Sequence, residues 1–419
     1  MKTTIRKTLA LLSVPLVALV ALFGCSTPVE NQSGGSASVL HFKADGTFKV
    51  MAISDIQDGA DVSPDAIKLI TMALDAENPD MVVLNGDNIF DWSPSLLVSG
   101  DNVKKSIETF MAPITAKKIP FAVVFGNHDF TVPMNQEAQW DFYQTFPGAL
   151  GTMNKIGDRV GNYNVVVENT SGSPALNLWF FDSGGSTLSA NGSAMLDEQL
   201  TWYKNTSDAL KSANGGTPIP SVAFQHIPVP QIYDLLTEVG PGTPGAVEGT
   251  GVHSGRYYVA NDALVTDGVV GEGPCPLDDD KSEFDTWRQQ GDVMAAVFAH
   301  DHKNDFRGTL QGIELMYDSS VGFYSYGNGD QHGVRVLEFN QDSVKNYQTR
   351  MVVWKDLTDQ TIPQEEQYDG TFAHGDVYLY YVIGGVVAAA VVTIAVIVVV
   401  KVRRRIRKRR SAVATKTRS

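Results

Sequence analysis

The sequence predicts an α/β fold with a largely parallel sheet, in one large domain that covers residues 40–360. Short apolar runs alternate with helical stretches, which is typical of strand–helix–strand units. No stretch between residues 40 and 360 has the composition of a linker between domains. Of the 419 residues, 43% are hydrophobic and 19% are charged. This composition is ordinary for globular proteins and excludes a wholly disordered chain.

The first part of the domain alternates regularly between strands and helices. Strands are predicted for the apolar runs 48–53, 81–84 and 121–125. Helices are predicted over 63–78 and roughly 103–117. The first helix begins with a capping residue, Ser63, followed by Pro64, and its apolar residues then recur at helical spacing.

The later part of the domain is less regular. Strands are predicted at 176–181, 221–224, 293–298, 334–339 and 350–354. Residues 234–291 are rich in Gly, Pro and Asp and are predicted to form a long surface excursion.

Five of the predicted strands end in residues that can bind metal ions. The blocks are Asp55-Ile56-Gln57, Gly86-Asp87-Asn88, Gly126-Asn127-His128-Asp129, His226 and His300-Asp301-His302. In open α/β sheets the carboxyl ends of the strands form the edge where ligands bind. Carboxylates, amide oxygens and imidazoles suit Mn, Fe or Zn better than a thiolate-bound metal.

Each block taken singly also has an ordinary structural explanation. Asp55 or Asp87 could cap a helix, and Asn127 could be a turn residue. His226 could be a loop histidine, and the His300/His302 pair could be a polar strand end. The five blocks together favour a metal site over these separate explanations.

The ordered blocks resemble the motifs of the calcineurin-like metallophosphoesterase superfamily. Its usual order is Asp-x-His, Gly-Asp, Gly-Asn-His-Asp/Glu, a lone His and Gly-His-x-His. The resemblance covers roughly residues 45–345 and is closest to the purple-acid-phosphatase-like branch related to plant type 29 enzymes. It implies a layered α/β/β/α sandwich with two transition metal ions, either divalent or trivalent.

The resemblance also implies a role for each matching residue. Asp55, Gln57, Asp87 and His302 would hold the first metal, and Asp87, Asn127, His226 and His300 would hold the second. His128 would lie beside the metals as proton donor or phosphate contact. Asp129, its neighbour in sequence, is the candidate to orient the His128 ring. The implied reaction is hydrolysis of a phosphorylated small molecule or phosphoprotein, by in-line attack of a hydroxide that bridges the metals.

Two departures from the family pattern leave alternatives open. Gln57 replaces a histidine, which is consistent with a non-catalytic surface protein that keeps the fold as a binding module. Phe90 stands where purple enzymes have an iron-binding tyrosine, so no purple centre is expected. Phosphodiesterase or nuclease activity is a further alternative. Nucleic acid is a poor partner, because residues 25–400 contain 20 basic and 47 acidic residues.

The two ends of the chain predict export and membrane anchoring. Residues 1–24 resemble a signal peptide, with Cys25 as a candidate lipidation site, and residues 25–39 form a flexible tether. Residues 377–400 are uncharged and long enough for a transmembrane helix. The basic residues 401–419 would face the cytoplasm, placing the domain outside the cell membrane. If Cys25 is not lipidated, it could instead pair with Cys275.

Overall fold

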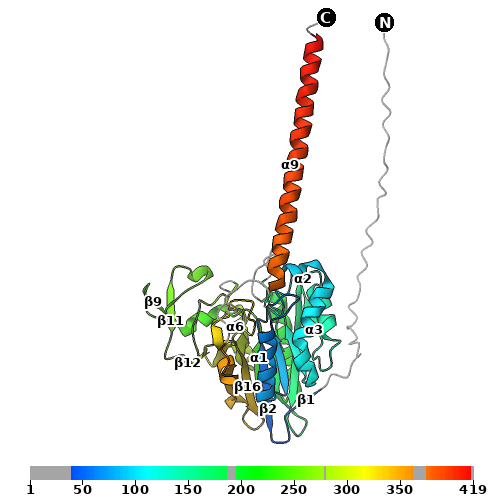
Figure 1. Cartoon of the computed structure of the whole chain (residues 1–419). Helices are drawn as coiled ribbons and strands as arrows, with labels where there is room; N and C mark the ends of the chain where they lie inside the picture. Colours follow the sequence, from blue (N-terminus) through cyan, green and yellow to red (C-terminus); the bar gives the residue numbers. More distant parts are fainter. Residues whose placement is uncertain (1–38, 186–194, 278–279, 362–373, 417–419) are drawn as a thin grey trace, which may run out of the picture. The chain divides into compact units, whose positions relative to one another are not determined.

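The computed structural model describes residues 39–185, 195–277, 280–361 and 374–416. The predicted signal peptide, nearly all of the tether and Cys25 lie outside these ranges. Within them the fold is α/β, as the sequence predicts (Figure 1).

Most described strands belong to two large mixed sheets. The larger has nine strands, in the spatial order β1 (Leu40–His41), β6 (Arg159–Glu168), β7 (Pro174–Phe180), β8 (Ser221–Phe224), β13 (Val293–Phe298), β15 (Ile313–Tyr317), β14 (Arg307–Leu310) and β12 (Val265–Asp267), with β5 (Asn154–Ile156) paired to β6. The second has five, in the order β17 (Gln348–Val353), β16 (Gly333–Asn340), β2 (Thr47–Ile53), β3 (Met81–Asn85) and β4 (Phe121–Val124). A small third sheet contains β10 (Val247–Glu248), β11 (Tyr257–Ala260) and β9 (Leu236–Val239).

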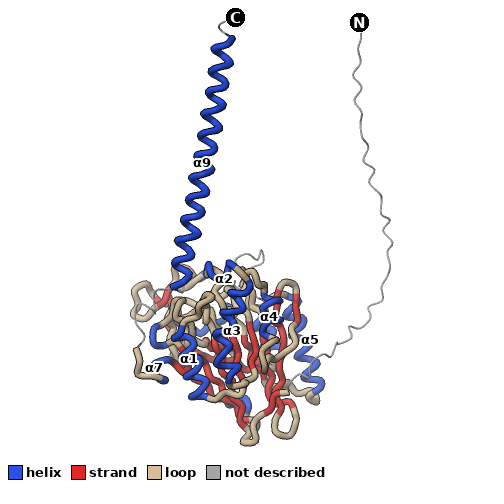
Figure 2. Tube along the Cα trace, turned by 45° about the vertical axis from the view of Figure 1, so that its right-hand side comes forward, coloured by secondary structure: helices blue, strands red, loops and turns tan. Residues whose placement is uncertain are grey.

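Helices lie along the sheets and in the connections. The described α-helices are α1 (Pro64–Glu77), α2 (Pro94–Val98), α3 (Gly100–Ala116), α4 (Gln136–Tyr143), α5 (Asp197–Ala213), α6 (Ser282–Gln290), α7 (Trp354–Leu357) and α9 (His374–Lys416). Four short 3-10 helices are η1 (Pro230–Leu235), η2 (Gly251–His253), η3 (Gly329–Gln331) and η4 (Val344–Asn346). Figure 2 shows α1 and α3 side by side in front of the strands.

Successive side chains of β7 are buried in two different cores, which shows how the layers stack. Leu178 and Phe180 join a core that also contains side chains of β2, β3, α1 and α3. Trp179, between them in sequence, joins a second core with residues of α5 and α6. Successive strand residues point to opposite faces, so the larger sheet separates the two cores. The layers therefore follow the predicted α/β/β/α order.

Local sequence signals explain the bounds of α1. The Ser63 side chain accepts hydrogen bonds from the backbone N–H groups of Asp65 and Ala66, and Pro64 occupies the first turn. Asn78 ends the helix in the left-handed conformation. The predicted helix 63–78 therefore matches α1 together with its two caps.

The sheets are less parallel than the sequence predicts. The central pairs β2–β3, β3–β4, β7–β8 and β8–β13 are parallel, whereas β6–β7, β2–β16 and β16–β17 are antiparallel. The antiparallel neighbours β6–β7 and β16–β17 are joined by short connections, which need no crossover helix. Hairpins thus account for β6–β7 and β16–β17, whereas β2–β16 pairs strands that lie far apart in the sequence.

The predicted surface excursion at 234–291 is only partly correct. It contains the small third sheet, but its last part forms α6, where Phe284 and Trp287 are buried in the second core. The sequence did not predict the burial of Phe284 and Trp287, because polar residues surround them and the segment contains no apolar run.

Helix α9 is the one described helix that is long and apolar enough to cross a membrane. Its candidate span is Val382–Arg405, with a mean hydropathy of 2.9. The sequence places the span at 377–400, slightly nearer the start of the helix. Its length and composition indicate membrane anchoring without fixing which side the domain faces.

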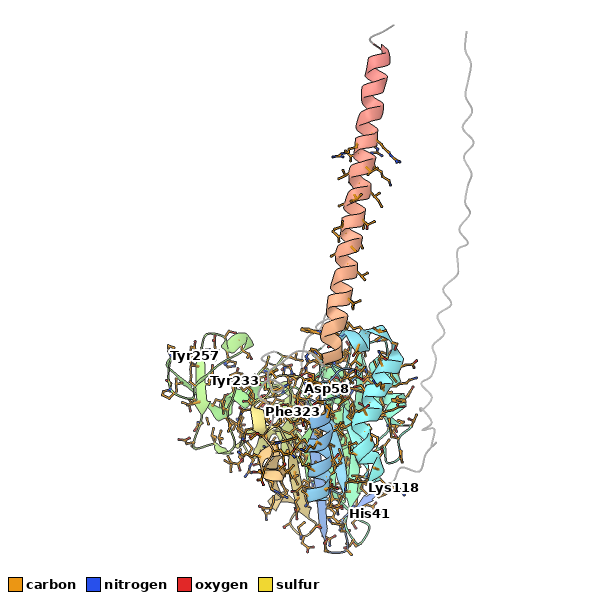
Figure 3. All side chains as sticks on the ribbon, in the orientation of Figure 1. His41, Asp58, Lys118, Tyr233, Tyr257 and Phe323 are labelled. Carbon is orange, nitrogen blue, oxygen red and sulfur yellow. The ribbon has the colours of Figure 1, made fainter. Side chains whose placement is uncertain are left out.

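The carboxyl ends of β2, β3 and β4, after which the polar residues come, lie at one end of the domain. Figure 3 labels Asp58, which follows β2, at the end of the domain opposite Lys118, which precedes β4. Because β2 and β4 both run parallel to β3, the carboxyl ends of all three lie at the Asp58 end.

Candidate metal centre

Every predicted site residue follows a strand that ends at this edge. Asp55 and Gln57 follow β2, and Asp87 follows β3. Asn127 and His128 come after β4, His226 after β8, and His300 and His302 after β13. The structure thus brings together residues from five segments of the two large sheets.

The backbone is strained at four of these positions. Asp55, Gln57, Asp87 and His300 have positive φ angles of 49°, 44°, 47° and 74°. Side chains other than glycine rarely adopt this conformation, and such strain clusters at functional sites. Each strained residue turns sharply where a strand ends.

Two glycines allow the site residues to pack closely. A Cβ atom on Gly126 would lie 2.2 Å from Asp87 Oδ1, and one on Gly86 would lie 2.5 Å from the His226 ring. Gly86 also has a φ of +94°. The sequence predicts both glycines as turn residues, and the structure adds that no side chain fits at either position.

Five acidic and imidazole side chains form two overlapping groups. Asp87, His226 and His300 each offer a ligand atom within 4.8 Å of the others, as do Asp55, Asp87 and His302. His226 Nε2 lies 3.1 Å from Asp87 Oδ2, and His302 Nε2 lies 3.3 Å from Asp55 Oδ1. Asp87 belongs to both groups.

Unsatisfied buried atoms indicate that these groups fit metal ions. Asp55 Oδ2 and Asn127 Oδ1 are buried and make no hydrogen bond within the described residues. Buried polar atoms normally have hydrogen-bond partners. Two unpartnered oxygens beside the paired imidazoles and carboxylates therefore match the ligand chemistry of a transition metal.

Two imidazoles are oriented by backbone carbonyls. His226 Nδ1 lies 3.2 Å from the carbonyl oxygen of Asn85, and His302 Nδ1 lies 2.7 Å from that of Tyr326. A carbonyl only accepts, so each Nδ1–H donates and each Nε2 faces the carboxylates. Bonds of this kind commonly fix metal-binding histidines.

The buried charges strongly shift one another's pKa values. Burial opposes ionisation of Asp87, but the neighbouring imidazoles, His226 foremost and then His128, together outweigh it and lower the pKa of Asp87. Burial likewise opposes protonation of His226, yet Asp87 raises the pKa of His226 to about 10. Without metal, a proton on His226 therefore balances the carboxylates. A metal ion would replace that proton.

His300 behaves in the opposite way. Desolvation and the neighbouring charge on His226 lower the pKa of His300 to about 3. Its ring is therefore neutral at physiological pH, which is the form that binds metals.

Gln57 lies in the cluster but differs from the other residues. Its side-chain oxygen Oε1 accepts a hydrogen bond from Ser325 Oγ, and this Oγ also lies 3.4 Å from His302 Nδ1. Gln57 Oε1 therefore has a hydrogen-bond partner, whereas Asn127 Oδ1 has none within the described residues.

His128 lies beside the two groups. Its backbone N–H donates to Asp87 Oδ1 at 2.7 Å, and its Nδ1 lies 2.8 Å from Asp91 Oδ1. Burial disfavours the charged ring, but Asp87 and then Asp91 outweigh that effect and raise the pKa of His128. The ring is thus held near a buried carboxylate in a readily protonated form.

The expectation that Asp129 orients His128 needs correction. The Asp129 carboxylate accepts hydrogen bonds from the backbone N–H groups of Gly126, Asn88 and Ile89, at 2.7, 3.0 and 3.2 Å. Asp129 therefore joins the loop after β3 to the loop after β4. The carboxylate that contacts the His128 ring belongs to Asp91.

Sequence reasoning missed Asp91, Ser325 and the carbonyl of Tyr326. Asp91 lies four residues after Asp87 in a loop already assigned to the site, so its position offered a signal. Ser325 and Tyr326 lie in the turn-rich segment between β15 and β16. No pattern in that segment distinguishes them.

Comparison with known families agrees with the order of the blocks. The family model described as "Calcineurin-like phosphoesterase" matches residues 48–304, more than half of the chain. The chain belongs to the calcineurin-like phosphoesterase family. This family of phosphoric ester hydrolases supports a dinuclear metal site, for which the chain has the candidate ligands described above.

Two plant relatives confirm the branch of this calcineurin-like phosphoesterase. "Probable inactive purple acid phosphatase 14" of Arabidopsis thaliana is 27% identical over 71% of the chain and 77% of its own length. "Probable inactive purple acid phosphatase 29" of the same plant is 27% identical over 76% and 85%. A solved dimetal phosphatase from Danio rerio is 14% identical over 73% of the chain and 99% of its own, with a TM-score of 0.46.

Proposed function

We propose that this protein is a metal-dependent phosphomonoesterase anchored to the cell membrane, with its domain outside. One observation carries the proposal: ligand atoms from strands of both large sheets converge in two groups that share Asp87. Phosphoesterases of the two-metal type need such a shared pair of sites.

The proposed ligands divide into two sets. We name Asp87, Asn127, His226 and His300 the imidazole-rich set, and Asp55, Gln57, Asp87 and His302 the carboxylate-rich set. When bound, two transition metal ions of the Mn, Fe or Zn kind supply Lewis acidity and lower the pKa of water. Asp87 would contribute a ligand atom to both ions.

His128 would supply the proton that the leaving group needs. Asp91 accepts from its Nδ1 and holds the ring, which leaves Nε2 for the substrate. The raised pKa of His128 favours the protonated ring, which is the form a proton donor needs. Departure of the leaving oxygen as an alcohol, rather than an alkoxide, is the step that this proton assists.

The first test is hydrolysis of an aryl phosphate by the full chain in detergent, after metal removal and after reloading with Mn, Fe or Zn. We expect activity only with metal. Asp87→Asn should abolish it, because this substitution weakens both sets. Asp75→Asn is a matched control, since Asp75 is exposed on helix α1 and forms an ion pair with Lys117. Full activity in Asp87→Asn would overturn the proposal.

A second candidate is a non-catalytic binding module. Two observations favour it: Gln57 replaces an imidazole, and the names of both plant relatives contain "inactive". Elemental analysis separates the candidates. Two ions per chain together with turnover support the hydrolase, whereas a folded chain that retains no ion supports the module.

The membrane part of the proposal rests on helix α9 and on the basic residues in its last part. Lys401 and Arg403–Arg405 lie at the end of the candidate span, and the positive-inside rule then places the domain outside. Protease added to intact cells should remove the domain and spare a tag at the C-terminus. Protection of the domain instead would reverse the orientation.

A further inference from the structure

Two exposed aromatic side chains lie against the metal centre. Within the described residues outside α9, several large apolar side chains are exposed. The aromatic ones among them are Trp92 and Tyr326, with exposed fractions of 52% and 38%. Each of them contacts an imidazole of the site. This coincidence points to a binding surface, because large aromatic rings are otherwise stabilised by burial.

Trp92 lies next to the proposed proton donor. Its ring centroid is 5.5 Å from that of His128, and the two rings meet edge to face. The ring centroid of Phe90 lies 5.2 Å from that of His128 and 6.2 Å from that of Trp92. The rings of Phe90, Trp92 and His128 therefore contact one another and form a continuous aromatic cluster at the proposed proton donor.

Tyr326 stacks on the imidazole of His302. Its ring is nearly parallel to that of His302, with centroids 4.1 Å apart, and Lys303 Nζ lies 5.7 Å from the same ring. His302 in turn lies 3.3 Å from Asp55. The carboxylate-rich set therefore also borders an exposed ring, with a cation beside it that favours anionic ligands.

We propose that Trp92 and Tyr326 border a subsite for a planar leaving group, which makes aryl phosphates the preferred substrates. The inference rests on the proposed function and deepens it. A ring joined directly to the ester oxygen would reach Trp92 while that oxygen stays at His128, because the two side chains are in contact. Ring stacking is tolerant of substituents, so the subsite selects planarity rather than one particular ring.

Binding of two phosphonates separates this subsite from the chemistry of the metal centre. Phenylphosphonate and methylphosphonate both present a phosphonate group that the enzyme does not hydrolyse, and only the first carries a ring. We expect the Zn-loaded full chain, measured by calorimetry, to bind phenylphosphonate more tightly. Trp92→Ala should weaken phenylphosphonate binding about fivefold to tenfold and leave methylphosphonate binding unchanged.

Two further variants complete the test. Trp92→Phe should restore most of the preference, since a ring remains. Leu97→Ala is the matched control, because Leu97 is 48% exposed on the neighbouring helix α2 and has no role in the site. Equal weakening of both phosphonates in Trp92→Ala, or no preference in the wild-type chain, would overturn the subsite. A Trp92-dependent preference in a chain that hydrolyses no ester would retain the subsite and overturn only the proposed hydrolase function.

Discussion

The imidazole-rich and carboxylate-rich sets share Asp87 but differ in the ligands around it. The first has two imidazoles and the unpartnered amide oxygen of Asn127. The second has a single imidazole, and the oxygen of its amide, Gln57, already accepts a hydrogen bond from Ser325. More nitrogen ligands favour Zn, whereas oxygen ligands favour Mn or Mg. The difference teaches that the two sites should bind different metals with different strengths.

The largest expected effect separates the two sets directly. We expect Zn to bind the wild-type chain in a tight step and a weaker step. His226→Ala should remove the tight step, and His302→Ala should remove the weaker one. Loss of a direct ligand should cost at least about 100-fold in affinity, since the loss of an outer partner already costs 10–100-fold. Calorimetric titration of metal-free protein measures both steps, and identical losses in the two variants would contradict the comparison.

The next largest effect concerns His128, the proposed proton donor. Asp91→Asn removes the charge beside His128, so the pKa of His128 should fall. Activity that needs protonated His128 exists below this pKa and is lost as pH rises through it. The alkaline limb of the pH–rate profile should therefore move to lower pH, and kcat should fall about 100-fold. Asp61→Asn, at an exposed ion pair with Lys105, is the control. An unmoved limb would exclude His128 as the acid.

A smaller effect should make the two sets more alike. Gln57→His gives the carboxylate-rich set a second imidazole, so the weaker Zn should bind about tenfold tighter. Gln144→His provides the control, because Gln144 is exposed at the end of α4. If the weaker step stays unchanged while the variant keeps its melting temperature, Gln57 is not the cause of the asymmetry.

The smallest effect isolates the hydrogen bond to Gln57. Ser325→Ala removes the donor and leaves the amide oxygen to the metal, so the weaker Zn should bind about threefold tighter. Ser171→Ala, in an exposed turn, should change nothing. A weaker second step in Ser325→Ala would show that Ser325 supports the site instead of competing for Gln57.

The sequence predicted most of the candidate site because its residues lie where strands end. Apolar runs located β2, β3, β4, β8 and β13, and the polar residue after each run identified the shared edge. The same method missed β6, whose residues do not form a simple apolar run, and α6, whose anchors Phe284 and Trp287 are surrounded by polar residues. It also assigned Asp129 to His128 because the two are adjacent in sequence. Contacts such as His128–Asp91 and Gln57–Ser325 depend on how loops pack, which no local pattern records.

Asp129 has a consequence for anyone who redesigns this protein. Its carboxylate holds backbone groups of two loops that are about forty residues apart in sequence. Neither loop should be exchanged alone with that of another scaffold. Replacing the loop after β3 would remove the backbone donors of Asn88 and Ile89, and replacing the loop after β4 would remove the carboxylate that accepts from them. Grafting experiments should therefore transfer the two loops together, including Asp129.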